Sequence, residues 1–424
     1  MNLIESLVPT DFRTSLTSPV RRFYFGTFLN CVGAGLTLSF FVVYLHNVRG
    51  FSTSFSTLLL AVSALAGLAA SPLWGTLTDR YGPFRVILLA YVSSALALVG
   101  WAFAHTEREA IVAALALSFF GGGNWGPGST MLSRLVPEIH RQRAFGFNFM
   151  LVNLGIGFGG LVSATVVDLH HPFTFTVLYL MDAGITAMAA LNMLWLRAYG
   201  GPATEHLDDP LKSSEGWRTV LGDRRLVQYV LASLVLMIGG YGSQEAGFSL
   251  FVVNNLKLPV HVIGIIFFFN TSTIVLAQLW VLNRIERRSR TGVLAVAGVL
   301  WFVFWVILDV ALALPPVLAV ISLCIAMAIF AIGETMQSPV GPALVNQIAP
   351  EHLRGRYNTA AGLAWGVSGT FAPVITAIFF SNNLGNWWPI SVGVAALVGS
   401  VLMLNLRRGL NASEDGRDSA DVAT

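Results

Sequence analysis

Two stretches of this chain nearly repeat each other: VPEIHRQRAFGF at residues 136–147 and APEHLRGRYNTA at residues 349–360. Both place Pro-Glu ahead of an Arg-x-Arg pair. The prolines, Pro137 and Pro350, are 213 positions apart, which is about half of the 424-residue chain. This spacing indicates two related halves, each with the same basic loop.

The composition excludes a water-soluble globular protein. Hydrophobic residues make up 55% of the chain and charged residues 11%, whereas soluble domains carry about 25% charged residues. Twelve apolar runs are long enough to cross a hydrocarbon core about 30 Å thick. They cover residues 23–45, 55–77, 84–104, 110–133, 144–167, 173–196, 226–253, 259–282, 291–313, 316–345, 357–380 and 386–406.

Basic residues fall almost entirely on one side of these spans. With the N-terminus inside, only Arg49, Arg108 and Lys257 of the 25 lysines and arginines lie in outer loops. The positive-inside rule therefore places both termini in the cytoplasm. We expect an all-α integral membrane protein with 12 transmembrane helices, arranged as two six-helix bundles in a 6+6 pseudo-repeat.

A polar segment rich in glycine and proline separates the two sets of six spans. We expect an N-terminal six-helix bundle over residues 1–196, a cytoplasmic linker over 197–225 with a short helix near Trp217, and a C-terminal six-helix bundle over 226–406. The chain ends in NASEDGRDSADVAT, residues 411–424, which is small, polar and acidic. We therefore expect a disordered cytoplasmic tail over residues 407–424.

The loop between the second and third spans reads GTLTDRYGPFR, residues 75–85. It resembles the loop motif of the major facilitator superfamily, in which Gly-x-x-x-Asp-Arg-x-Gly precedes basic residues. The matching positions are Gly75, Asp79, Arg80, Gly82 and Arg85, and the pattern departs at Pro83 and Phe84. The resemblance implies a cluster that holds the cytoplasmic side closed. A carboxylate at this helix end can meet an arginine or a facing helix N-terminus.

The repeated loops occupy equivalent places, between spans four and five and between spans ten and eleven. They resemble basic turns of the same superfamily. Their arginines, which are Arg141, Arg143, Arg354 and Arg356, either anchor the loops at the anionic leaflet or form a gating pair with Asp79.

Small residues in the fifth span, GIGFGGLVSA, suggest close helix packing. The span partly resembles the fifth-helix motif of exporters, in which Gly155 and Gly159 match glycines and Gly160 takes the place of a proline. The repeat offset of 213 carries Gly160 onto Pro373, so the proline occurs in the second half. Small-residue packing alone also explains this pattern.

Ionisable groups within spans are costly and are therefore functional candidates. Glu334 in the tenth span is the first choice for proton coupling or cation recognition, followed by Glu245 in the seventh span and Asp182 in the sixth. The alternative for each is a carboxyl group with a structural hydrogen bond. Neutral polar residues that could line a cavity are Asn30, Asn124, Gln244, Gln278 and Gln337. Asn124 and Gln337 are equivalent under the repeat, which favours a shared central cavity.

Together, the seventh-span QEAG and the tenth-span sequence from Gly333 resemble bacterial twelve-span drug:proton antiporters of the superfamily. The resemblance implies proton-coupled export of a hydrophobic or cationic small molecule by alternating access, without a cofactor and with the proton gradient as energy source. An arginine present in the fourth span of many such antiporters is missing here. The alternatives are uptake or facilitated diffusion of a polar metabolite and, from another class, a non-transporting membrane sensor or assembly factor.

The remaining expectations concern other classes of site and partner. No catalytic motif, phosphate-binding loop or metal-ligand pattern occurs, so the sequence does not predict an enzyme or a metal site. We expect a monomer in the bacterial plasma (inner) membrane that binds a small-molecule substrate and the lipid bilayer, but no nucleic acid.

Overall fold

The computed structural model describes residues 10–37, 41, 44–168, 171–202, 216–259, 261–286 and 288–417. These residues form helices and connecting turns, with no strand among them. Ten of the described helices are long and apolar enough to cross a membrane. The all-α prediction is therefore confirmed.

The chain divides into two compact units. Unit 1 comprises Met1–Ala144, Asn148–Trp217 and Ala349–Thr359, and unit 2 comprises Phe145–Phe147, Arg218–Ile348 and Ala360–Thr424. One division falls between Trp217 and Arg218, inside the predicted linker. Residues 203–215 of that linker lie outside the described part of the chain. The short helix expected near Trp217 is α13, Trp217–Gly222.

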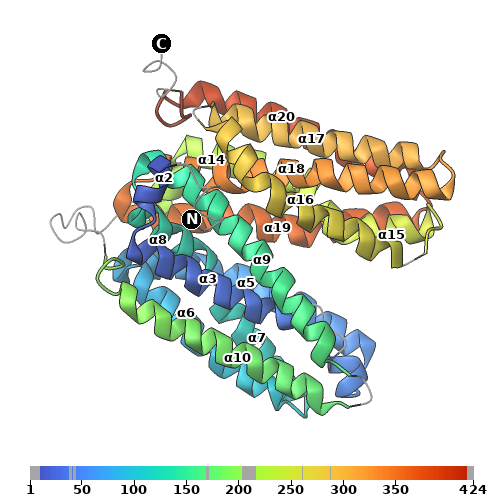
Figure 1. The fold of residues 1–424 in the computed structure, drawn as a ribbon, viewed down its shortest axis with the longest axis horizontal. Helices are drawn as coiled ribbons and strands as arrows, with labels where there is room; N and C mark the ends of the chain where they lie inside the picture. Colours follow the sequence, from blue (N-terminus) through green and yellow to red (C-terminus); the bar gives the residue numbers. More distant parts are fainter. Residues whose placement is uncertain are drawn as a thin grey trace. The chain divides into compact units, whose positions relative to one another are not determined.

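Unit 1 contains the first six predicted spans except Phe145–Phe147 of the fifth, which belong to unit 2. In this unit α10 packs against α6 and α3, while α7 packs against α5 and α6 (Figure 1). The elements of this part of the chain are α2 (Thr10–Ser15), α3 (Ser18–Thr37), η2 (Tyr44–Val48), α5 (Thr53–Tyr81), α6 (Pro83–Ala102), α7 (Glu107–Gly121), α8 (Trp125–Leu135), η3 (Glu138–His140), α9 (Arg141–Val166), α10 (Phe173–Met193) and η4 (Leu194–Leu196).

Unit 2 contains most of the second half, in which α17 lies between α18 and α20 (Figure 1). Its first helices are α14 (Arg224–Met237), η5 (Ile238–Gly242), α15 (Ser243–Asn254) and α16 (His261–Ile285). They are followed by α17 (Arg290–Ala311), α18 (Pro316–Ile348), η6 (Glu351–Leu353), α19 (Arg354–Ser381), η7 (Gly385–Trp387), α20 (Trp388–Leu406) and η8 (Arg407–Gly409). Of these, η6 and the first turn of α19 belong to unit 1.

The fourth predicted span is broken in its middle. Helix α7 ends at Gly121 and α8 begins at Trp125, because Gly123 N–H donates to the Phe120 carbonyl at 2.9 Å instead of continuing the α-helical pattern to Phe119. The indole of Trp74 donates to the Phe119 carbonyl at 2.7 Å. This bond supplies a partner for the carbonyl that the break frees, which a spanning segment requires.

The seventh predicted span is interrupted in a similar way. It contains the π-helical turn η5, where Gly240 has φ −116° and ψ −109° and the Ser243 N–H donates to the Gly240 carbonyl. Here the Trp305 indole donates to the Gly239 carbonyl at 2.6 Å. Each unit thus contains a helix break at glycines, with a tryptophan from a neighbouring helix bonded to a carbonyl of the break.

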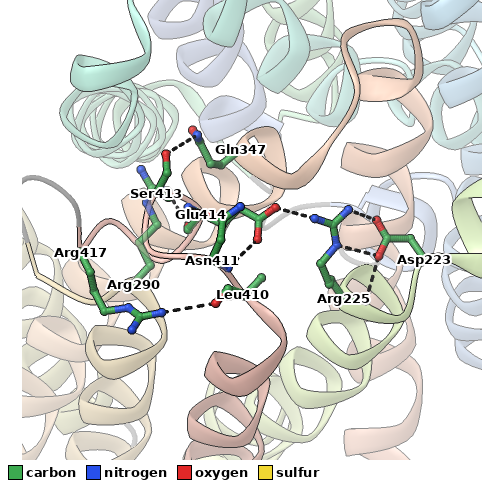
Figure 2. A network of polar contacts seen from close by, with 9 residues as sticks. All are labelled: Asp223, Arg225, Arg290, Gln347, Leu410, Asn411, Ser413, Glu414 and Arg417. Atoms are coloured by element: carbon green, nitrogen blue, oxygen red, sulfur yellow. Dashed lines mark hydrogen bonds and ion pairs between the residues drawn. The ribbon is translucent and has the colours of Figure 1, made fainter.

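The start of the predicted disordered tail is folded, which corrects the expectation for residues 407–417. Asp415 is fully buried and accepts hydrogen bonds from Thr291 N at 2.9 Å and Ser289 Oγ at 2.7 Å. Figure 2 shows Arg225 between Asp223 and Glu414, at 2.9 and 2.5 Å. The acidic residues that suggested disorder instead bind arginines and a helix N-terminus of unit 2. Residues 418–424 lie outside the described range.

Candidate functional site

The buried carboxylate of Glu334 lies at the centre of the candidate site in unit 2. Glu334 is 5% exposed on α18 and accepts a hydrogen bond from Asn270 Nδ2 of α16 at 2.6 Å. The Tyr241 hydroxyl of η5 interacts electrostatically with it. No lysine, arginine or histidine of the described residues interacts with Glu334. Its one charged neighbour is another carboxylate, Glu245.

Aromatic rings enclose the Tyr241 side chain beside this carboxylate. The Tyr241 ring centroid lies 4.6 Å from that of Trp365, 5.4 Å from Trp301 and 5.8 Å from Phe330. Trp301 also stacks on Phe330, with centroids 5.4 Å apart. The faces of such rings attract cations. A carboxylate beside aromatic rings is therefore an arrangement suited to a proton or to an organic cation.

The helix break in η5 places Tyr241 in this site. A Cβ atom built on Gly240 would lie 2.2 Å from the Trp301 ring, so only glycine allows the chain to pass the indole here. Short π-helical segments occur frequently at functional sites. Immediately after the break, Gln244 is buried, and the exposed Glu245 lies in the first turn of α15. A carboxylate is favourable there because of the helix dipole.

Asp182 is the buried carboxylate of unit 1. It is 4% exposed on α10, and it accepts hydrogen bonds from Thr37 Oγ1 at 2.8 Å and Thr186 Oγ1 at 3.3 Å. Asp182 belongs to unit 1, whereas Glu334 and Glu245 belong to unit 2.

The neutral polar candidates take different positions. Gln278 is fully buried and donates through Nε2 to the Thr335 carbonyl at 3.2 Å, which ties α16 to α18 one residue from Glu334. Asn124 lies at the break between α7 and α8, and its buried Oδ1 has no partner among the described residues. Asn30 and Gln337 are half-buried. The cavity predicted to be shared by Asn124 and Gln337 stays a prediction.

The loop motif forms a compact contact within unit 1. Asp79 is 1% exposed, and its carboxylate accepts from Gly355 N at 2.6 Å and from Arg356 N and Nη1, both at 3.2 Å. Asp79 thus binds both an arginine and the N-terminus of α19, the two partners considered from the sequence. A Cβ on Gly75 would lie 2.7 Å from Thr359 Oγ1, so glycine is needed for this approach.

The other motif positions serve the turn and the surface. Gly82 has φ +84°, and a Cβ there would lie 2.3 Å from the Gly200 carbonyl oxygen, so a side chain is excluded both by the conformation and by the contact. Arg80 and Arg85 are exposed. These two residues do not take part in the Asp79 contact.

The repeated loops have the same local structure. Pro137 and Pro350 share nearly equal backbone angles, and each precedes a 3₁₀ turn followed by a helix that begins at Arg141 or Arg354. These arginines line one cavity of about 680 Å³ in unit 1, together with Glu138 and Glu351. Arg143 is half-buried, and Arg356 alone of the four loop arginines binds Asp79.

The glycines of the fifth span divide into two kinds. A Cβ on Gly155 would lie 2.8 Å from the Cys31 Cβ, and a Cβ on Gly159 would lie 2.2 Å from the Val32 carbonyl oxygen, so both glycines contact α3 closely. Gly160 faces open space, and its counterpart Pro373 is exposed in α19. The packing interpretation holds for Gly155 and Gly159.

Sequence reasoning missed two residues that interact with Glu334. Asn270 stands in the apolar run FFFNTST, and a lone amide in a spanning helix is a signal that could have identified it. Tyr241 lies in GGYG, where the glycines indicate an irregular helix. Neither signal specifies Glu334 as the partner, because Asn270 is 64 positions and Tyr241 is 93 positions away from it in the sequence.

Comparisons with known proteins agree with this architecture. The family profile described as Major Facilitator Superfamily matches residues 23–314, and the one described as Sugar (and other) transporter matches residues 241–407. The chain is 24% identical to the uncharacterized MFS-type transporter YttB of Bacillus subtilis over 392 residues, which cover 90% of this chain and 91% of YttB.

Two further relatives have more specific names. The Na(+), Li(+), K(+)/H(+) antiporter of Planococcus maritimus is 23% identical, with 87% of this chain and 92% of that protein covered. The quinolone resistance protein NorA of Staphylococcus aureus is 26% identical over 36% of this chain and 39% of NorA. Among solved structures, a bacterial homologue of the iron transporter ferroportin in an outward-facing state has a TM-score of 0.77 at 11% identity, covering 92% of this chain and 100% of that one.

Proposed function

Because the chain belongs to the Major Facilitator Superfamily, whose members are multi-pass membrane transporters and not enzymes, we propose that it exports a hydrophobic or cationic small molecule in exchange for protons. In this proposal the two six-helix halves alternate between forms open to either side of the bacterial plasma membrane, with both termini in the cytoplasm. The twelve predicted spans and the fold shared with solved transporters support the transport function.

The observation that carries the proposal is the hydrogen bond of Glu334 with Asn270, together with the lack of a basic partner for Glu334 among the described residues. A buried ionised carboxylate without a counter-charge is costly, and the nearby Glu245 increases that cost. The site therefore favours a bound proton or a bound cation. One positive charge is enough to balance the Glu334 carboxylate, so the proton and the cation compete for it. Antiport requires such competition.

The contacts suggest how binding changes the site. When Glu334 is ionised, it accepts the hydrogen bond from Asn270 and interacts with the Tyr241 hydroxyl. Proton uptake turns one carboxylate oxygen into a donor, which changes the hydrogen bonding that Glu334 offers to Asn270 and Tyr241. Tyr241 belongs to the helix break in η5, so we expect this change to act on the seventh span.

The names of two relatives support this choice of substrate and coupling. An antiporter that exchanges monovalent cations for protons and a quinolone resistance protein both resemble this chain in sequence. In the same proposal, the Asp79–Arg356 contact and the matched loops hold the cytoplasmic side closed during part of the cycle.

The direct test measures transport in liposomes that contain the purified protein. A fluorescent cationic dye and a quinolone serve as probes, with and without a pH gradient. We expect wild-type protein to move at least one probe against its gradient only when a pH gradient is imposed, and Glu334→Gln to abolish this coupled movement. Asp309→Asn is the matched control, because Asp309 is an acidic residue of α17 that is not part of the site.

Two outcomes contradict the proposal. Equal gradient-driven transport by wild type and Glu334→Gln removes Glu334 from coupling. Transport by wild type that does not respond to the pH gradient indicates a facilitator instead.

A further inference from the structure

We infer that Asp182 is a second exchangeable proton site, located in unit 1 and distinct from Glu334. Asp182 is a residue of α10, and α3 packs directly against its carboxylate. The inference adds a second proton-binding residue to the proposed antiport. The role of Asp182 in transport rests on that proposed function. The existence of the site can be tested without transport.

The first observation is the absence of a counter-charge. The two hydroxyl groups of Thr37 and Thr186 are the hydrogen-bond partners of Asp182, and no basic side chain of the described residues interacts with it. The nearest basic residue of α3 that precedes Gly33 is Arg22, 11 positions earlier, or about 16 Å along a helix. Two hydrogen bonds from neutral hydroxyl groups stabilise the ionised form of a carboxyl group far less than an ion pair with a cation does.

Among the residues that the structure describes, no positively charged group of the surrounding helices interacts with Asp182. Tyr179, about one turn away on α10, is buried and interacts electrostatically with Asp182. The helices that pack against α10 contribute Tyr24 and Cys31 from α3 and Tyr91 from α6, all buried. Their arginines, which are Arg21, Arg22 and Arg85, stand within the first turns of α3 and α6.

The second observation is the tight packing of α3 over the carboxylate. A Cβ on Gly33 would lie 2.3 Å from Asp182 Oδ1, so the backbone of α3 approaches this oxygen directly. Metal cations with hard oxygen ligands take about six of them. Three side chains on two closely packed helices do not provide such a shell, whereas a proton needs no additional space. The site therefore selects a proton.

The third observation is that the Thr37 hydroxyl has two possible acceptors. It lies 2.8 Å from Asp182 Oδ2 and 3.5 Å from the Ala34 carbonyl oxygen. It can donate to the ionised carboxylate. When Asp182 is protonated, it can instead accept from the acid and donate to Ala34. Both protonation states thus have a hydrogen-bonded arrangement with little movement, which is what reversible exchange requires.

Infrared difference spectroscopy of the purified full-length protein tests this inference. Spectra are recorded from about pH 4 to about pH 9, the range in which perturbed carboxyl groups titrate. Uniform ¹³C labelling of aspartate shifts aspartic acid bands and leaves glutamic acid bands in place. We expect a titrating carboxylic acid band that moves with the label, is lost in Asp182→Asn, and is retained in Glu334→Gln and Asp309→Asn.

A second pair of variants keeps the test valid if Asp182→Asn does not fold. Thr37→Val removes the switching hydroxyl and Thr37→Ser keeps it. We expect Thr37→Val to move the midpoint of the labelled band by about one pH unit, the effect of one hydrogen bond to a charged group, and Thr37→Ser to leave it in place.

The inference is overturned if no label-sensitive band titrates, or if such a band persists unchanged in Asp182→Asn. It is also overturned if both Thr37 variants leave the midpoint unchanged. These results do not depend on probe transport, so they are distinguishable from a failure of the liposome experiment. If the site exists and antiport holds, Asp182→Asn lowers the number of protons exchanged per substrate without abolishing transport.

Discussion

At the scale of single residues, the contact of Asp79 shows how one carboxylate can join three partners. It accepts two backbone N–H groups at the start of α19 and one guanidinium N–H of Arg356. Charge-assisted hydrogen bonds are stronger than neutral ones. Because both side chains are buried, the loss of one charge leaves the other without compensation.

We therefore expect Asp79→Asn to lower the free energy of unfolding of unit 1. Asparagine retains an acceptor for Gly355 N, but the Arg356 charge loses its partner, and breaking a buried ion pair costs roughly 3–5 kcal/mol. Denaturant titration in detergent measures the loss. Arg80→Gln is the control, since Arg80 is the exposed neighbour and its change is expected to cost less than about 0.5 kcal/mol. Equal losses in the two variants would argue against the buried pair.

At the scale of elements, the contact between α9 and α3 depends on which glycine faces the neighbouring helix. Gly159 contacts the backbone of α3, while the adjacent Gly160 has nothing within contact distance of its missing side chain. The two positions are next to each other in one helix, so the same substitution has the same helix propensity at both. They differ in their packing.

We expect Gly159→Ala to destabilise the protein and Gly160→Ala to be neutral or slightly stabilising. A methyl group at 159 would overlap the Val32 carbonyl oxygen and separate the helices, which typically costs about 1–3 kcal/mol. At 160 the same methyl group gains helix propensity. Thermal unfolding in detergent compares the two, and a larger loss for Gly160→Ala would contradict the assigned face.

The folded C-terminal segment is a second element whose contribution can be measured. Asp415 caps α17 through Thr291 N and Thr291 Oγ1, both at 2.9 Å, and pairs with Arg417 at 3.0 Å. In the same segment, Arg290 Nη1 donates to the Glu414 carbonyl at 2.7 Å (Figure 2). The segment thus joins the ends of α14, α17 and α20.

We expect truncation after Gly409 to lower the unfolding temperature of the protein, because it removes the cap and leaves Arg225 and Arg290 with fewer partners. Asp415→Ala tests the cap alone, with an expected loss of about 1–3 kcal/mol for the buried donors left unpaired. Truncation after Arg417 keeps every one of these contacts and serves as the control. If all three variants unfold alike, the segment does not stabilise unit 2.

At the scale of the whole molecule, the sequence predicted the helices well. A segment in the hydrocarbon core has to satisfy its own backbone hydrogen bonds, so a long apolar run forms a helix. Eleven of the twelve predicted spans have helices within a few residues of their bounds. The remaining one is the first span, whose second part includes residues outside the described range. The sequence repeat at Pro137 and Pro350 also corresponds to a shared local structure, because similar turn residues favour similar turns.

The site was harder to predict than the fold. Glu334 and Asp182 could be identified individually, since a charge in an apolar span stands out. Their partners could not, because Tyr241, Asn270 and Thr37 are common residue types whose contacts depend on helix rotation and on breaks in the helices. The folded segment at 407–417 was missed for a related reason: composition reports charge but not the arginines that bind it.

Orientation in the membrane follows from the distribution of basic residues and can be tested for the whole chain. We expect Arg108→Cys to react with a membrane-impermeant maleimide in intact cells, and Arg197→Cys to react only after permeabilisation. Both positions are exposed. They lie on opposite sides of the predicted spans, and we expect the arginine-rich side to stay in the cytoplasm because translocating it is unfavourable. The native cysteines, Cys31 and Cys324, are buried, so wild-type protein gives the background. The reverse labelling pattern would show that the termini lie outside. The contact between Asp79 and Arg356 would then lie on the external side.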